Sequence, residues 1–93
     1  MDEEFYSLYN KTKFNKGDFV TIRSGKTKIY GGIFIKYEEV DFRSTPVAVI
    51  NVKYEASFFD KKEIDVIHSY WLENVVKMTE EESKKFNWTL KEE

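Results

Sequence analysis

The chain has 93 residues, no cysteine and a net charge of −2 at pH 7. This length fits one hydrophobic core, and the lack of cysteine excludes disulfides and thiolate metal sites. The near balance of charges argues against a general binder of phosphate backbones. Met1 is followed by three acidic residues, and no window holds the roughly 20 apolar residues of a membrane span. We therefore expect one domain, 1–93, that is cytoplasmic and does not enter membranes.

The first third of the sequence predicts a short helix and then two strands. Phe5, Leu8 and Tyr9 have helical spacing within 3–10, and 15–18 has the composition of a turn. Alternating β-formers predict a strand over 19–24. A second strand is predicted over 30–40, with a bulge or bend at its glycine pair. Alternation along this strand predicts that one face carries Ile33, Ile35 and Tyr37. The opposite face then carries Phe34, Lys36 and Glu38.

The middle of the chain predicts three more strands. The segment 47–54 is apolar on both faces at its start, which is typical of a central strand. The charged segment 57–63 is predicted to be a hairpin loop, and strands are predicted over 64–71 and 75–78. Phe58 and Phe59 are adjacent in that loop. We expect one ring to fold back on the core and the other to anchor a partner, or both rings to cap an open end of the fold.

The last segment predicts a helix. Thr79 and Glu82 have the spacing of a capping box, and acidic residues fill the first turn. Favourable pairs at i, i+4 extend the pattern, which predicts a C-terminal helix over 80–91.

Two motifs carry a resemblance to a known family. The stretch 14–22 resembles the opening of bacterial and phage SH3-like barrels, including KOW-type and Tudor-like relatives, and 70–77 is similar to their closing turn and strand. The resemblance covers about 14–78 and implies a five-stranded antiparallel barrel over those residues. Together with the two helices predicted from local patterns, the expected fold is mainly β (α+β), with a short N-terminal helix before the barrel and a C-terminal helix over 79–93 after it. By position it implies that six aromatic residues bind partners: Tyr30, Tyr37, Tyr54, Phe59, Tyr70 and Trp71.

No pattern in the sequence points to catalysis, a metal or a cofactor. His68 is the only histidine, and a lone histidine on a strand is usually a packed or rim residue. The aspartates at possible strand ends are better explained as turn formers: Asp18, Asp41, Asp60 and Asp65. The sequence therefore predicts no catalytic residue, metal ligand or cofactor site.

These observations favour a non-enzymatic module that binds a protein partner. Lys, Glu, Asn, Ile, Phe and Tyr usage suggests an AT-rich bacterial or phage genome, so one version is a phage or mobile-element inhibitor or regulator of a host protein. The alternative is a nucleic-acid binder in which a basic loop, Arg23, Lys26 and Lys28, follows the backbone while Tyr30 stacks on a base. Self-association through open strand edges, or through an undocked C-terminal helix, is also left open.

Overall fold

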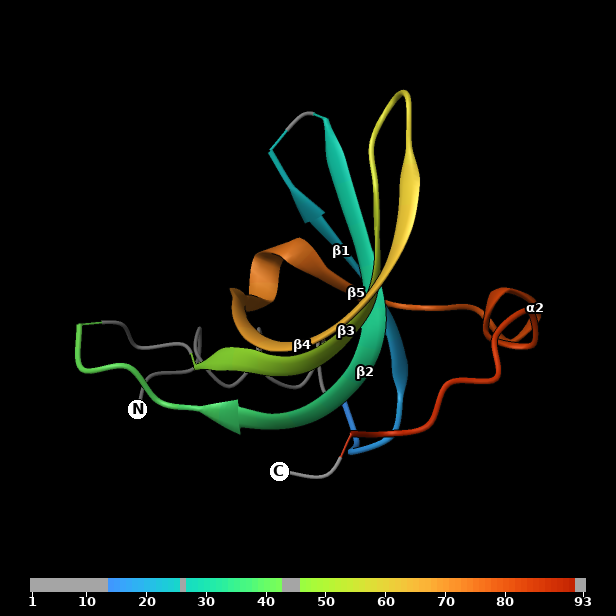
Figure 1. Ribbon diagram of the computed structural model, residues 1–93. Helices are drawn as coiled ribbons and strands as arrows, with labels where there is room; N and C mark the ends of the chain where they lie inside the picture. The colour runs from blue at the N-terminus through green and yellow to red at the C-terminus, as the bar shows by residue number, and fades with distance from the viewer. Residues whose placement is uncertain (1–13, 26, 43–45, 92–93) are drawn as a thin grey trace.

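The fold is a single bent sheet of five antiparallel strands, seen in a computed structural model that describes residues 14–25, 27–42 and 46–91 (Figure 1). The strands are β1 Phe19–Ser24, β2 Lys28–Glu38, β3 Val47–Ala56, β4 Lys61–Trp71 and β5 Val75–Lys77. Their order in the sheet is β4-β3-β2-β1-β5. The mainly β prediction is confirmed, and each strand begins and ends within three residues of its predicted bounds. The predicted N-terminal helix over 3–10 lies outside the described residues.

A tight turn leads the chain into β1, as the sequence predicted. Gly17 has a φ of +100°, a conformation that favours glycine at the third position of such a turn. The Asp18 amide donates to the Asn15 carbonyl at 3.0 Å, and the Asn15 amide donates to Asp18 Oδ2 at 2.8 Å. Asp18 is therefore a turn former, in agreement with the prediction.

The two faces of the sheet carry different sets of side chains. One face carries four side chains that are inaccessible to solvent: Val20, Ile22, Ile50 and Val52. We call this face the inner face. Full burial of such side chains contributes about 1.5–3 kcal/mol each. The core cluster on this face comprises Phe14, Val20, Ile22, Phe34, Ala48, Ile50, Val52, Leu72 and Val75. The opposite, outer face carries Phe19 and Ile33, which are paired between β1 and β2.

The prediction for the faces of β2 was wrong beyond Phe34. The β2–β3 register shifts between Phe34 and Lys36, so Ile35 is an extra residue. This bulge places Tyr37 on the same face as Phe34, and their ring centroids lie 4.8 Å apart. The extra residue shifts the alternation of side chains between the two faces by one position. Simple alternation therefore assigned Tyr37 to the wrong face.

A second irregularity, at the predicted glycine pair, turns Tyr54 to the outer face. The register between β2 and β3 shifts between Gly31 and Gly32, and Tyr54 pairs with Gly31 whereas Val52 pairs with Gly32. A Cβ on Gly31 would lie 2.1 Å from the Tyr54 ring. The ring therefore packs directly on the glycine backbone, and a side chain at position 31 would displace the Tyr54 ring from its place.

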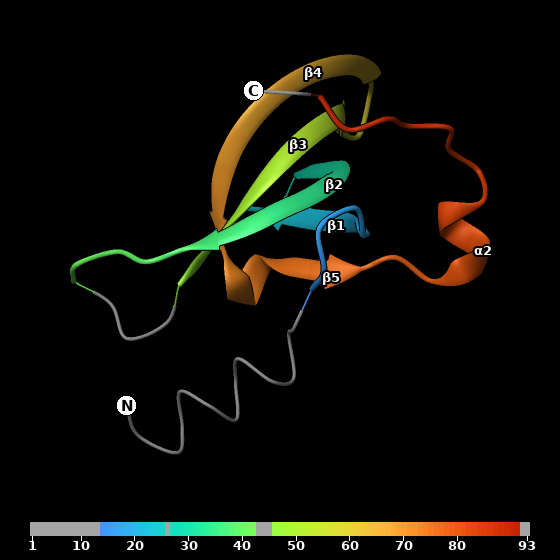
Figure 2. The same cartoon turned by 90° about the horizontal axis from the view of Figure 1, so that it is seen from below.

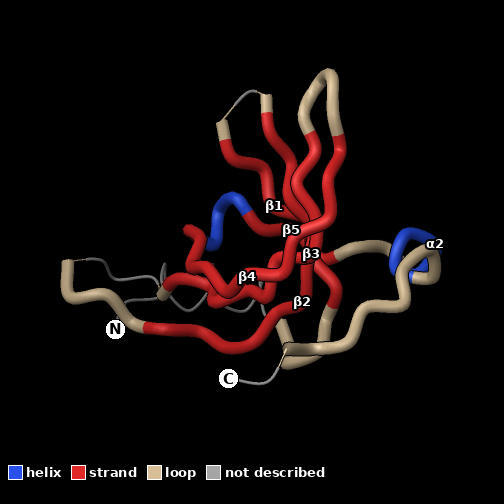
Figure 3. The backbone as a smooth tube through the Cα atoms, viewed as in Figure 1, coloured by secondary structure: helices blue, strands red, loops and turns tan. Residues whose placement is uncertain are grey.

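The predicted C-terminal helix over 80–91 is wrong in extent. The capping box at Thr79 and Glu82 is present, but α2 covers only Glu80–Ser83 (Figure 3). Beyond a short turn the chain is irregular, and half-buried Phe86, Trp88 and Leu90 alternate with exposed residues. Docking of these side chains on the sheet outweighs the local i, i+4 pairs, each of which contributes only about 0.2–0.5 kcal/mol.

This C-terminal segment, 84–91, returns to the sheet after leaving it through α2 (Figure 2). Trp88 contacts Phe19 of β1, with ring centroids 5.0 Å apart. The Lys91 amide donates to Asn51 Oδ1 at 2.8 Å, and Asn51 Nδ2 donates to Asp65 Oδ1 at 2.8 Å. Asn51 is inaccessible to solvent and is the buried polar residue of the described core. Its amide therefore fastens the segment to the outer face.

Candidate functional site

The candidate site is the tip of the β3–β4 hairpin. Two hairpins, β1–β2 and β3–β4, project from the same end of the sheet (Figure 1). The β3–β4 turn is closed by the Ser57 amide, which donates to the Asp60 carbonyl at 2.7 Å. Phe58 is 82% exposed and Phe59 is 98% exposed. Neither ring folds back on the core or caps an end of it, so the expected packing of this pair was wrong, and the expectation that a ring anchors a partner stays a prediction.

The two rings form one apolar knob on an otherwise charged hairpin. Their centroids lie 6.4 Å apart. The residues that follow them, Asp60, Lys61, Lys62 and Glu63, are all charged and exposed. We call Phe58 and Phe59 together the hairpin tip.

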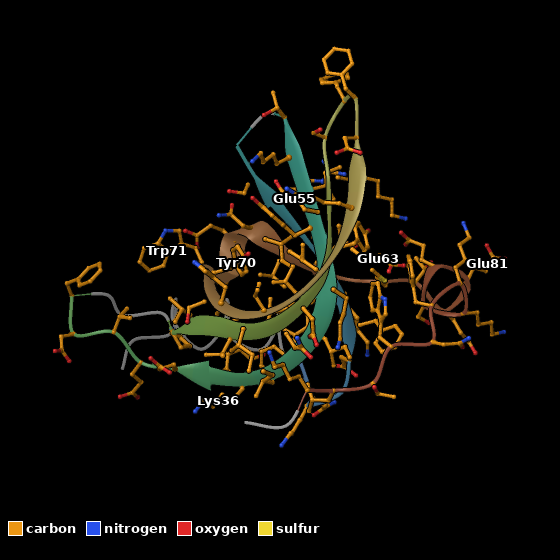
Figure 4. All side chains as sticks on the ribbon, viewed as in Figure 1. Lys36, Glu55, Glu63, Tyr70, Trp71 and Glu81 are labelled. Atoms are coloured by element: carbon orange, nitrogen blue, oxygen red, sulfur yellow. The ribbon has the colours of Figure 1, made fainter. Side chains whose placement is uncertain are left out.

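Ion pairs between strands hold the base of this hairpin. Lys28 Nζ lies 2.8 Å from Glu55 Oε1, and Lys62 Nζ lies 3.9 Å from Glu55 Oε2. The hydrogen bond with Glu55 raises the pKa of Lys28, and the same bond lowers the pKa of Glu55. Figure 4 shows Glu55 between the two projecting hairpins. These contacts link β2, β3 and β4, so the hairpin tip has a supported base.

The basic residues proposed for nucleic-acid binding are only partly assembled. Arg23 is exposed at the end of β1. Lys28 is paired with Glu55, so its charge is largely offset. Lys26 lies outside the described residues.

Two of the predicted partner-binding residues, Tyr30 and Tyr70, meet on the inner face. Their ring centroids are 5.9 Å apart, and both rings pack partly buried against the core cluster. Burial, followed by Tyr30 and then Glu55, raises the pKa of the Tyr70 hydroxyl. His68 lies beside Tyr70, with ring centroids 5.0 Å apart. The pair is more a cover over the core than an open binding surface.

The other predicted residues are dispersed. Tyr37 accepts a hydrogen bond from the Phe14 amide and packs in the core cluster. Trp71 contacts Phe42 edge-on at 6.1 Å and lies at the end of β4 remote from the hairpin tip (Figure 4). Tyr54 lies on the outer face under the C-terminal segment. The six residues therefore do not form one patch, and among them Phe59 alone belongs to the hairpin tip.

Three contributors to these surfaces were not singled out from the sequence. No sequence pattern assigned a role to Asn51, Glu55 or Lys61. Phe86 and Trp88 were assigned to a helix, although the run Phe86-Asn87-Trp88-Thr89-Leu90 alternates strictly between apolar and polar residues. That alternation was the signal for an extended docked segment.

The described residues contain no group of three or more His, Cys, Asp or Glu side chains that could hold a metal ion. His68 is exposed, and its Nδ1 lies 2.9 Å from the Ser69 carbonyl oxygen. Asp65 was predicted to form a turn, but it lies within β4, where its carboxylate accepts from Asn51 and Lys53. These hydrogen bonds, that from Asn51 first, lower the pKa of Asp65.

Within the described part of the chain, no helix is long and apolar enough to cross a membrane. Comparison with protein-family models, with curated proteins and with solved structures finds no match to this chain.

Proposed function

We propose that this chain is a non-enzymatic protein-binding module and that the hairpin tip is its anchor. The observation that carries the proposal is the exposure of the two adjacent phenylalanine rings, 82% and 98%, at the end of a hairpin. Exposed apolar rings gain nothing for folding, whereas aromatic residues that fill a partner's pocket commonly dominate binding energy.

The surroundings of the tip support this role. Each buried phenylalanine removes roughly 150–250 Å² of surface from water, so two rings supply about 300–500 Å² of a typical 800 Å² half-interface. The charged residues 60–63 fit the polar rim that surrounds such anchors. A module of this kind acts by occupying its partner's surface, which is the mode of action of a small inhibitor or regulator.

For the fold, we infer an SH3-like barrel. The inference is supported by the antiparallel pairing of β5 with β1 and by the 3-10 turn η1, Leu72–Asn74, between β4 and β5. The contact of Tyr30 with Tyr70 across the inner face is consistent with strands that curl towards closure.

The nucleic-acid alternative has weaker support. Its basic loop would need unpaired cations, and Glu55 offsets Lys28. A nucleic-acid complex would also leave the apolar hairpin tip without a role, unless both rings stack on bases.

The test is an affinity capture from lysate of the organism that carries the gene, performed with and without nuclease treatment. The double variant Phe58→Ser, Phe59→Ser is compared with the wild type and with Phe42→Ser, because Phe42 is 78% exposed elsewhere on the molecule. We expect a stoichiometric protein partner that the double variant loses at least tenfold and Phe42→Ser retains. Equal capture by all three proteins would refute the role of the tip, and recovery that vanishes with nuclease would favour nucleic acid.

A further inference from the structure

A second surface with binding character lies on the outer face, where the C-terminal segment meets the sheet. Tyr54 of β3 packs against Phe86 and Trp88, with ring centroids 5.7 Å apart in each case. Phe86 and Trp88 stack at 4.1 Å with an interplanar angle of 18°. We call these three rings the aromatic platform. Tyr54 lies more than 30 residues before Phe86 and Trp88 in the sequence, so only the folded chain assembles the platform.

The platform already holds one cation. Lys61 Nζ lies 4.6 Å from the centroid of the Tyr54 ring and 5.6 Å from that of the Phe86 ring. An ammonium group within about 6 Å of a ring face is attracted by the ring quadrupole, by about 0.5–1 kcal/mol at an exposed site. Lys61 itself is exposed, so it is a replaceable occupant.

Charged side chains of both signs surround the platform. A cavity of about 270 Å³ lies beside the rings, and its charged lining residues are Lys53, Lys61, Glu63 and Asp65. Asp65 is paired with Lys53 at 2.9 Å, whereas Glu63 makes no ion pair with any residue that the structure describes. In Figure 4, Glu63 lies on the side of β4 that faces the C-terminal segment.

A further carboxylate is close to the rings. Burial raises the pKa of Tyr54, and the negative charge of Glu82 raises it further. Three features together favour a positively charged, weakly hydrated group over an anion or a neutral polar group: aromatic faces that already hold a lysine ammonium, the Glu63 carboxylate without an ion pair among the described residues, and a small open cavity.

We propose that the aromatic platform is a binding site for a small organic ammonium ion, with Lys61 as its intramolecular occupant. An external alkylammonium group displaces Lys61 and takes its place over Tyr54 and Phe86. The site lies on the face opposite the Tyr30–Tyr70 pair and is separate from the hairpin tip. It does not rest on the proposed protein-binding function.

The proposal is tested by following the indole N–H signals of Trp88 and Trp71 by NMR during titration with tetramethylammonium chloride. Trp71, which contacts Phe42 instead, is the internal reference. Uncharged tert-butanol of similar shape controls for apolar binding, and sodium chloride controls for ionic strength. A parallel titration with N-acetyl-lysine amide distinguishes a lysine side chain of a protein from a free quaternary ammonium compound as the source of the cation.

The decisive variant is Lys61→Gln, with Lys62→Gln as its matched control because Lys62 pairs with Glu55 instead. We expect the ammonium ion to shift the Trp88 signal selectively and to bind two- to fivefold more tightly to Lys61→Gln, the change that corresponds to a lost competitor of about 0.5–1 kcal/mol. Lys62→Gln should bind as the wild type does.

Three results would overturn the proposal. One is a Trp88 shift that tert-butanol reproduces in Lys61→Gln, and another is an equal shift of Trp71. The third is unchanged affinity in Lys61→Gln when its signals otherwise overlay those of the folded wild type. None of these results bears on Phe58 or Phe59, so the two proposals fail independently.

Discussion

Replacement of Asn51 by leucine tests how the C-terminal segment is held. Asn51 is fully buried, and its side chain makes three hydrogen bonds. Its Nδ2 donates to Asp65 Oδ1 at 2.8 Å and to the Val66 carbonyl at 3.3 Å, and its Oδ1 accepts from the Lys91 amide at 2.8 Å. Leucine has a similar volume but can replace none of these bonds.

The expected fall in the free energy of unfolding depends on whether each lost hydrogen bond has a neutral or a charged partner. The two bonds to neutral groups contribute about 0.5–1.5 kcal/mol each, and the bond to the solvent-exposed Asp65 carboxylate adds to that contribution. The exposed Asp65 carboxylate regains water in the variant, and the leucine gains apolar burial, so part of this sum is offset. We expect the free energy of unfolding to fall by about 2–3 kcal/mol, which lowers the Tm by roughly 10–20 °C for a domain of this size.

The free energy of unfolding is measured in urea for four proteins: the wild type, Asn51→Leu, Lys91→Pro and the double variant. Lys91→Pro removes the single N–H group that Asn51 Oδ1 accepts from. We expect the two changes to be non-additive by about 1 kcal/mol, because they remove the same hydrogen bond. A cost below about 0.5 kcal/mol for Asn51→Leu, or strict additivity, would show that Asn51 does not fasten the segment.

Three further predictions concern other parts of the molecule. Gly32→Ala should destabilise the fold by more than about 2 kcal/mol in urea unfolding, because its Cβ would lie 2.3 Å from the backbone oxygen of Asn51; a neutral result would contradict this packing. Asp65 has a lowered pKa, so its hydrogen bonds stabilise the protein fully above its unfolded pKa of about 4 and are lost as the pH falls through the folded value. Asp65→Asn should flatten the acid limb of a plot of stability against pH, and an unchanged limb would refute the assignment. Phe59→Ser should change the free energy of unfolding by less than about 0.5 kcal/mol, since the ring is 98% exposed, and a larger loss in thermal melts would mean that the ring packs.

The strands could be predicted from the sequence because their patterns are local. Val47 to Val52 is buried on both faces, as its apolar run implied, and the Gly17 turn and the Thr79 capping box formed as predicted. These signals depend on neighbours within about four residues along the chain.

The wrong predictions for the face of Tyr37 and for the C-terminal segment involve partners that are distant in sequence. The bulge at Ile35 depends on the register with β3, and so the face of Tyr37 could not be read from β2 alone. The segment after Ser83 leaves the helix because Phe19 and Tyr54 offer its rings a surface.

In the candidate site, too, local features could be predicted from the sequence and contacts between distant residues could not. The sequence placed Phe58 and Phe59 in a charged hairpin loop but did not indicate that both rings are exposed, and the aromatic platform required knowledge of where the last residues return. Tyr30 and Tyr70, 40 residues apart, were both named from a resemblance, yet nothing in the sequence indicated that they touch.

The pairing of β5 with β1 also has a kinetic consequence. Val20 pairs with Lys77, so the sheet is completed only when residues 57 positions apart in the chain meet. Bringing these residues together costs chain entropy, which only three residue pairings between β1 and β5 offset. Folds rich in such distant contacts reach the native state in milliseconds to seconds rather than microseconds. The β2–β3–β4 meander, joined by short connections, is the part that can form first. The β5 strand is then the last to join and the first to leave, so the amides in the β1–β5 pairing should exchange faster than the hydrogen-bonded amides of the β2–β3–β4 meander.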